Sequence, residues 1–132
     1  HRLLPVIVSG LPFALALALS GSGGGTRHLL IVLLVAPLLE EAVFRAGLQE
    51  ALLRRWQVRP CLANVVTACV FAVAHMISRG DASAFSVALP ALLIGEVYRR
   101  TGRLRWCMAL HAAMNAVWLG WQATGPVLLR GR

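Results

Sequence analysis

Long apolar runs, broken by short groups of Gly, Pro and Arg, dominate the pattern along this chain. The runs lack the alternation of apolar and polar positions that a barrel strand needs, so they predict helices. The expected connecting loops are Gly21–Arg27, Trp56–Pro60, Arg79–Asp81 and Thr101–Arg103. The predicted helical segments span about Leu3–Ser20, His28–Arg55, Cys61–Ser78, Ala82–Arg100 and Leu104–Thr124.

The composition favours a membrane as the solvent of these helices. Hydrophobic residues make up 58% of the chain, charged residues make up 14%, and the mean hydropathy is +0.72, unlike a soluble domain. A helical span needs roughly 20 residues, so the chain can cross a bilayer about five times. We therefore predict an all-α fold, a polytopic transmembrane bundle of about five helices, in a single domain over residues 1–132. The chain begins with His1 rather than methionine, which is consistent with a fragment that lacks its true start.

The arginines lie in short groups between the apolar runs, as charges that flank a membrane do. The net charge of +8 does not form the continuous basic face of a nucleic-acid binder, so we expect no nucleic acid partner. The positive-inside rule places the N-terminus and the loops Trp56–Pro60 and Thr101–Arg103 in the cytoplasm. All thirteen Lys and Arg positions are arginine, and this short chain suggests a bacterial inner membrane. With five spans, the cytoplasmic side of the membrane would hold Arg2, Arg54, Arg55, Arg59, Arg99, Arg100, Arg103 and Arg105. The opposite side would hold Arg27, Arg79, Arg130 and Arg132.

Two adjacent acids, Glu40 and Glu41, lie inside the second apolar segment. An acidic side chain at the centre of a membrane helix costs at least about 2.5 kcal/mol and usually marks function. Arg45 follows Glu41 by four residues, a spacing that brings carboxylate and guanidinium together on one helical face. Glu40 points about 100° away around the helix and has no such counter-ion, which makes it a candidate general base or acid. The alternative is a buried cluster that only holds helices together.

Two further polar pairs lie in apolar segments at helical spacing. His75 lies in the third segment, four residues after Phe71, and His111 and Asn115 lie four residues apart in the fifth. Residues four apart share one face of a helix. A lone histidine in an apolar helix is usually a hydrogen-bonded packing residue, but polar groups on separate membrane helices tend to converge. We expect these side chains to meet Glu40.

A straight helix places these residues at unequal depths. Glu40 and His75 fall about 20 Å from the cytoplasmic ends of their segments and His111 about 10 Å from its own end, at 1.5 Å per residue. We expect the second segment to leave the hydrocarbon near Gly47, with an amphipathic stretch Gln49–Arg55 at the interface. Tilt would account for part of the mismatch.

Three motifs resemble those of the CPBP family, the CAAX protease and bacteriocin-processing group also called Abi, which includes the type II CAAX prenyl endopeptidase. Glu40-Glu41-Ala42-Val43-Phe44-Arg45 is similar to EExxxR, Phe71-Ala72-Val73-Ala74-His75 to FxxxH, and His111-Ala112-Ala113-Met114-Asn115 to HxxxN. The resemblance implies an intramembrane endopeptidase that acts on a membrane-associated protein or peptide. By that resemblance Glu40 and His75 activate a water, His111 and Asn115 hold the oxyanion, and Glu41 and Arg45 fix the catalytic helix.

The chemistry of the residues agrees with this resemblance, since peptide hydrolysis needs a base for water and donors for the developing oxyanion. No cofactor is required, but a zinc-dependent version remains open, in which Glu40, His75 and His111 would be the ligands and water the fourth. A second alternative is a non-catalytic immunity or scaffold protein whose polar cluster only associates helices. A small proton-relay transporter is a third, without an inverted repeat to support it.

Overall fold

The computed structural model describes residues 25–57 and 59–129, and all regular structure in these ranges is helical. Residues 26–55 form one continuous rod that alternates between α and π winding. The rest of the described chain forms three more helical stretches, the second of which opens with a 3₁₀ turn. The elements are α3 (Thr26–Leu30), η1 (Ile31–Val35), α4 (Ala36–Glu41), η2 (Ala42–Gln49), α5 (Glu50–Arg55), α6 (Pro60–Arg79), η3 (Ala82–Val87), α7 (Ala88–Thr101) and α8 (Leu104–Leu129).

Proline and glycine fix where these helices begin and end. Pro60 lies in the first turn of α6, where its missing N–H costs nothing. Gly80 and Gly102 follow α6 and α7 with φ of 64° and 61°, the left-handed conformation that terminates helices and favours glycine. Asp81 then accepts a hydrogen bond from the Ser83 backbone N–H at 2.9 Å and caps η3. The predicted helix bounds for residues after 27 are therefore confirmed to within a few residues.

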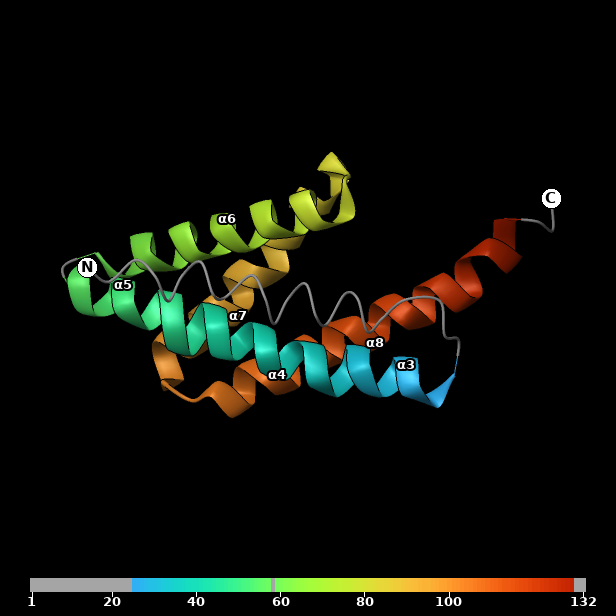
Figure 1. Ribbon diagram of the computed structural model, residues 1–132, viewed down its shortest axis with the longest axis horizontal. Coiled ribbons are helices and arrows are strands. Elements are labelled where there is room, and N and C mark those ends of the chain that lie inside the picture. The colour runs from blue at the N-terminus through green and yellow to red at the C-terminus, as the bar shows by residue number, and fades with distance from the viewer. Residues whose placement is uncertain (1–24, 58, 130–132) are drawn as a thin grey trace.

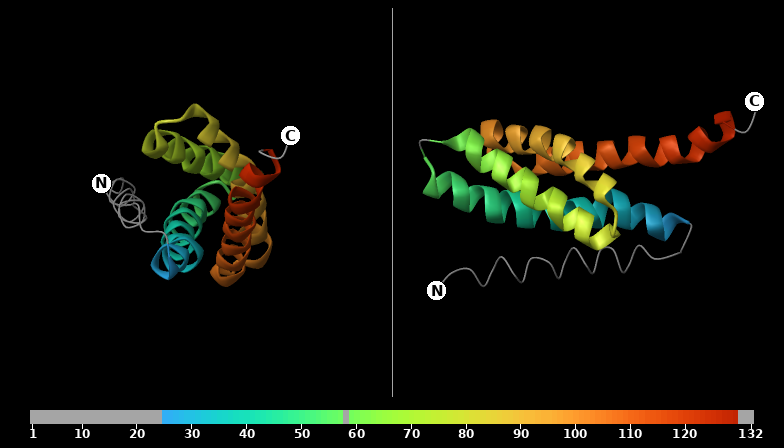
Figure 2. Two further views of the ribbon diagram at one scale, coloured as in Figure 1. Left: turned by 90° about the vertical axis from the view of Figure 1, so that its right-hand side faces the viewer. Right: turned by 90° about the horizontal axis from the view of Figure 1, so that it is seen from above.

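The helices pack lengthwise in an elongated bundle (Figure 1). The rod of residues 26–55 lies beside α8, and α7 packs against both α6 and α8. The α5–α6 and α7–α8 connections lie at the same end, and the α6–η3 turn points toward the other (Figure 2). The two arginine-rich loops therefore share one end of the bundle, as the sequence predicts.

The prediction of about five spans is met only in part. The segment Leu3–Ser20 lies outside the described residues. Within the described ranges, α6 is the one helix that is both long and apolar enough to cross a membrane by length and composition, with a mean hydropathy of 1.9. The rod carries Glu40, Glu41 and Arg45 within its apolar run, and α7 has only 14 residues.

A close contact at Gly95 joins the rod, α6 and α7. A Cβ atom at Gly95 would lie 1.9 Å from Asn64 Oδ1 and 2.8 Å from an Arg45 guanidinium nitrogen. Asn64 also donates to the Leu92 carbonyl at 3.1 Å, and Gln49 donates to the Gly95 carbonyl at 2.8 Å. The side chain of Gln49 is fully buried between helices, whereas the membrane depth of the stretch Gln49–Arg55 stays a prediction.

We predict that Gly95→Ala lowers the free energy of unfolding by about 1–3 kcal/mol, the usual range for overpacking a filled site. The added methyl group must displace Asn64 Oδ1, so the double variant Asn64→Ala/Gly95→Ala should recover part of the loss. Gly47→Ala is the matched control, since its new Cβ would make only ordinary contact, 3.6 Å from the Ala42 carbonyl oxygen. Thermal unfolding in detergent measures all three, and a Gly95→Ala protein that unfolds like the Gly47→Ala control would contradict the prediction.

Candidate active site

A fully buried ion pair lies at the centre of the bundle. Arg45 Nε donates to Glu41 Oε2 at 2.9 Å, and both side chains have 0% exposure. The other two guanidinium nitrogens donate to Gln49 Oε1 at 3.0 Å and to the Ala91 carbonyl of α7 at 2.9 Å. The pairing of Glu41 with Arg45 that the sequence predicts is therefore present. Each guanidinium nitrogen of Arg45 thus has an acceptor. These hydrogen bonds offset the loss of water around the buried charge.

The second carboxylate oxygen of Glu41 reaches α8. His111 Nδ1 lies 2.7 Å from Glu41 Oε1. Since the Glu41 carboxylate already accepts from Arg45, the proton of this hydrogen bond lies on Nδ1 of His111. The ion pair thus sets both the ring orientation and the tautomer of His111.

Glu40 approaches the other side of the same imidazole. Glu40 Oε2 lies 3.6 Å from His111 Nε2, a distance too long for a hydrogen bond. This oxygen is buried and has no hydrogen-bond partner within the described part of the chain. A buried carboxylate oxygen without a donor is unusual in proteins and calls for an explanation, of which a catalytic role is one. Glu40 is thus the carboxylate whose lone pairs remain available.

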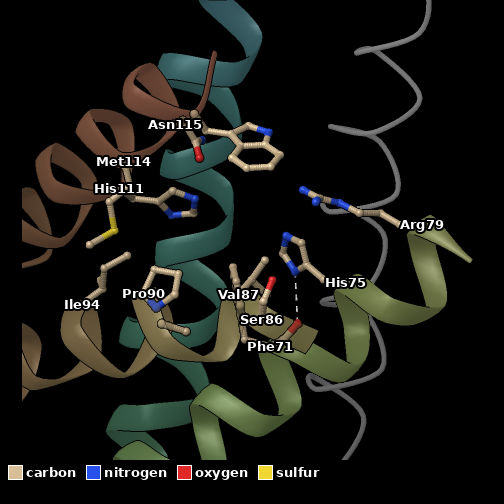
Figure 3. Close-up of a pocket in the computed structure, with 12 residues that line it drawn as sticks. Phe71, His75, Arg79, Ser86, Val87, Pro90, Ile94, His111, Met114 and Asn115 are labelled. Atoms are coloured by element: carbon tan, nitrogen blue, oxygen red, sulfur yellow. Dashed lines mark hydrogen bonds between the residues drawn. The ribbon is translucent and has the colours of Figure 1, made fainter. Parts of the chain in front are cut away.

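A cavity of about 270 Å³ opens beside His111. His75, from α6, and His111 and Asn115, from α8, converge on it, and Arg79 extends toward His75 (Figure 3). The other walls are mostly apolar. The remaining lining residues are Phe71, Ser86, Val87, Pro90, Ala91, Ile94, Met114 and Trp118.

Phe71, four residues before His75, contacts that histidine through both its backbone and its ring. Its carbonyl oxygen lies 3.1 Å from His75 Nδ1, and because a carbonyl can only accept, the proton lies on Nδ1 and leaves Nε2 of a neutral ring as an acceptor. The Phe71 ring lies 4.3 Å from the His75 ring and 6.1 Å from the His111 ring, measured between centroids. One aromatic side chain therefore packs against both histidines.

Asn115 is held by the rod as well as by its own helix. Its side-chain Nδ2 donates to the Val32 carbonyl at 3.0 Å. A carboxamide nitrogen carries two hydrogens, so the second N–H remains a potential donor. The hydrogen bond to η1 fixes the amide beside the cavity that it lines.

The six predicted site residues thus form two groups. Glu41, Arg45 and Glu40 lie behind His111 and do not line the cavity, whereas His75, His111 and Asn115 do. Glu40 Oε2 lies 3.6 Å from His111 Nε2, and His111 lines the cavity together with His75.

The predicted zinc ligand set does not form among the described residues. In those ranges no group of three or more His, Cys, Asp and Glu side chains is arranged to hold a metal ion. His75 therefore does not join Glu40 and His111 in a three-ligand site of the kind that catalytic zinc needs.

The sequence pattern did not identify three residues that shape this site. Gln49 and Asn64 link the Arg45 region to backbone carbonyls of α7, and Arg79, expected to belong to a loop, ends α6 and lines the cavity. Gln49 follows Arg45 by four residues and so shares the helical face of Glu41 and Arg45. This spacing was the signal in the sequence for a buried amide. Arg79 follows His75 by four residues, which was the corresponding signal there.

Fold and site together define an all-helical protein with acid–base groups buried among apolar helices beside a cavity. The family model described as type II CAAX prenyl endopeptidase Rce1-like matches residues 21–117, most of the chain and all six candidate residues. The chain belongs to this Rce1-like family, whose members are membrane-embedded proteases. No curated protein and no solved structure shows a significant match to the chain.

We predict that Arg45→Ala lowers the free energy of unfolding by about 3–5 kcal/mol, because it leaves the Glu41 charge buried without its partner. Arg54→Ala is the matched control on the same rod, since Arg54 pairs with Glu50 at an exposed position, where such pairs contribute about 1 kcal/mol or less. The measurement is the thermal midpoint and folded yield of both variants in detergent. Equal midpoints for the two variants would show that the Glu41–Arg45 pair does not stabilise the bundle.

Proposed function

We propose that this protein is an intramembrane endopeptidase that hydrolyses a peptide bond of a membrane-associated protein or peptide. Family membership supports a protease of the CAAX type. The observation that carries the proposal is the chain of contacts from Arg45 through Glu41 to His111, which holds one imidazole between two carboxylates at the wall of a cavity. Base, positioned donors and a largely apolar enclosure are what hydrolysis by an activated water requires.

In the proposed mechanism Glu40 is the proton acceptor for the attacking water. Its Oε2 has no donor within the described chain, so a lone pair is available for the proton. His75 assists by orienting the water, because its hydrogen bond to the Phe71 carbonyl holds the ring at the wall of the cavity. The water adds to the scissile carbonyl carbon, its proton passes to Glu40, and the amine leaves with a proton returned from that acid.

His111 and Asn115 are the proposed donors to the oxyanion. His111 must carry a proton on Nε2 for this role, in addition to the one that it donates to Glu41. Glu40 Oε2 lies 3.6 Å from His111 Nε2 and makes no hydrogen bond with it, so an N–H at Nε2 is left to point at the oxyanion while Nδ1 donates to Glu41. Asn115 contributes the N–H that is not directed to Val32. Glu41 and Arg45 act through His111 and are positioning residues.

The proposed membrane location rests on the apolar side chains at the surface of the helices. Large apolar side chains are exposed along every helical stretch of the described chain, among them Leu34, Ile77, Leu93 and Val117, each at least 60% exposed. An exposed apolar surface of this extent suits lipid contact. We propose about five spans in a bacterial inner membrane, with the Trp56–Pro60 and Thr101–Arg103 loops in the cytoplasm.

We predict that Glu40→Gln abolishes proteolysis by the protein reconstituted in liposomes, while the variant still inserts and unfolds at the wild-type temperature. Only the proton-accepting oxygen is lost, and the side-chain volume is kept. Glu50→Gln is the matched control, since Glu50 lies on the same rod but pairs with Arg54 away from the cavity. Turnover of a quenched fluorescent membrane peptide is the readout.

Two outcomes would contradict the proposal at different levels. Normal turnover by Glu40→Gln would remove Glu40 as the base. Absence of turnover by the wild type, over a library of membrane-anchored peptides, would favour the non-catalytic immunity or scaffold function.

A further prediction separates Glu40 chemistry from zinc chemistry. If the water is activated by Glu40 and His75, then 1,10-phenanthroline leaves turnover intact, and active enzyme contains far less than one metal per chain. His111→Ala then lowers kcat by about 10²–10³-fold, the effect of one oxyanion donor, with no change in metal content. Zinc at one per chain, lost with activity in both His75→Ala and His111→Ala, would instead establish the zinc-dependent protease.

A further inference from the structure

Arg79 is a cation at the cavity that the proposed mechanism does not use. It is the last residue of α6 and lies one turn beyond His75 on the same face. It lines the cavity with His75 and His111, and its guanidinium extends toward His75 (Figure 3). A basic residue in the last helical turn also favours the helix dipole, but the dipole does not direct a side chain into a cavity.

Arg79 forms no hydrogen bond and no close ion pair with the acids of the described part of the chain, and Glu40 and Asp81 interact with its guanidinium only through longer-range electrostatics. The acids of that part are engaged elsewhere: Glu41 with Arg45, Glu50 with Arg54, and Glu96 with Arg99 and Arg100. Glu40 faces His111, and Asp81 accepts from Ser83. Arg79 has neither an ion pair nor a hydrogen bond to any of them. An exposed guanidinium whose N–H groups make no hydrogen bond to these acids is suited to bind a carboxylate of a ligand.

The remaining walls indicate what accompanies that carboxylate. Apart from Ser86, the lining on the side of η3 and α7 is apolar, with Val87, Pro90 and Ile94, and Met114 of α8 continues it. An apolar side chain fits this surface. Residues four apart on a helix are separated by about 6 Å, close to the length of two extended residues. A carboxylate bound by Arg79 would therefore belong to a residue one or two positions from the bond held near His75.

We propose that Arg79 is a specificity-determining residue that binds a carboxylate of the substrate, while the apolar wall binds a neighbouring apolar side chain. This inference rests on the proposed protease function. The carboxylate is either the free C-terminus of the substrate or an acidic side chain near the scissile bond. Both present the same planar anion to a guanidinium.

The test uses the full chain in liposomes and three versions of one membrane-anchored, quenched peptide that the wild type cleaves. The first ends in a free carboxylate two residues beyond the cleaved bond, and the second ends there in a carboxamide. The third has the carboxamide end and a glutamate at that position. We expect the wild type to prefer one of the two carboxylate peptides over the carboxamide peptide by about 10- to 100-fold in kcat/KM, and the preferred peptide identifies the source of the carboxylate.

Arg79→Gln should reduce this preference to about one, mainly through KM, and Arg79→Lys should retain part of it. Arg59→Gln, at the opposite end of α6 and outside the cavity, should keep the full preference. A wild type that cleaves all three peptides equally would overturn the role of Arg79, as would an Arg79→Gln variant that keeps the preference or loses activity equally on every peptide. A wild type that cleaves none of the peptide library would overturn the protease function itself, which is a different failure.

Discussion

A guanidinium buried without access to solvent is the constraint on which this structure depends. Arg45 is fully buried and must find acceptors inside the bundle, because a charge left unpaired there is strongly destabilising. It finds them in Glu41, in Gln49 and in the Ala91 carbonyl of α7. The choice of partners fixes the rod of residues 26–55 against α7, and the second oxygen of Glu41 extends the same chain of contacts to α8.

This arrangement gives two adjacent glutamates different surroundings. Successive residues point about 100° apart around a helix, so Glu41 faces Arg45 while Glu40 faces the free side of His111. Glu41 is saturated by donors, and Glu40 has an oxygen without any in the described chain. Paired acids whose surroundings differ in this way are the usual basis for dividing a positioning role from a proton-transfer role. In the proposed function, the buried Glu41–Arg45 pair therefore positions the same imidazole that Glu40 faces.

Local spacing accounts for what the sequence could predict. Apolar runs and the glycines at helix ends predicted the helix bounds, and the four-residue spacing predicted the Glu41–Arg45 pair. Partners across helices could not be predicted in this way, because they depend on packing. Gln49 resembles an interfacial amide until α7 supplies its acceptor, and Gly95 resembles a flexible position until Asn64 fills the space of its missing Cβ. The contact of His111 with both acids likewise depends on how α8 packs against the rod.

The most direct test of the central claim is the protonation state of His111 in the intact protein. Solid-state NMR of the ¹⁵N-histidine-labelled protein in lipid reports which ring nitrogen carries the proton, and His111→Asn identifies the signal. We expect a protonated, hydrogen-bonded Nδ1 in the wild type and in Glu40→Gln, and a changed Nδ1 signal in Glu41→Gln, because Glu41 is its acceptor. An Nδ1 of His111 that is unprotonated in the wild type, or that does not respond to Glu41→Gln, would contradict the account.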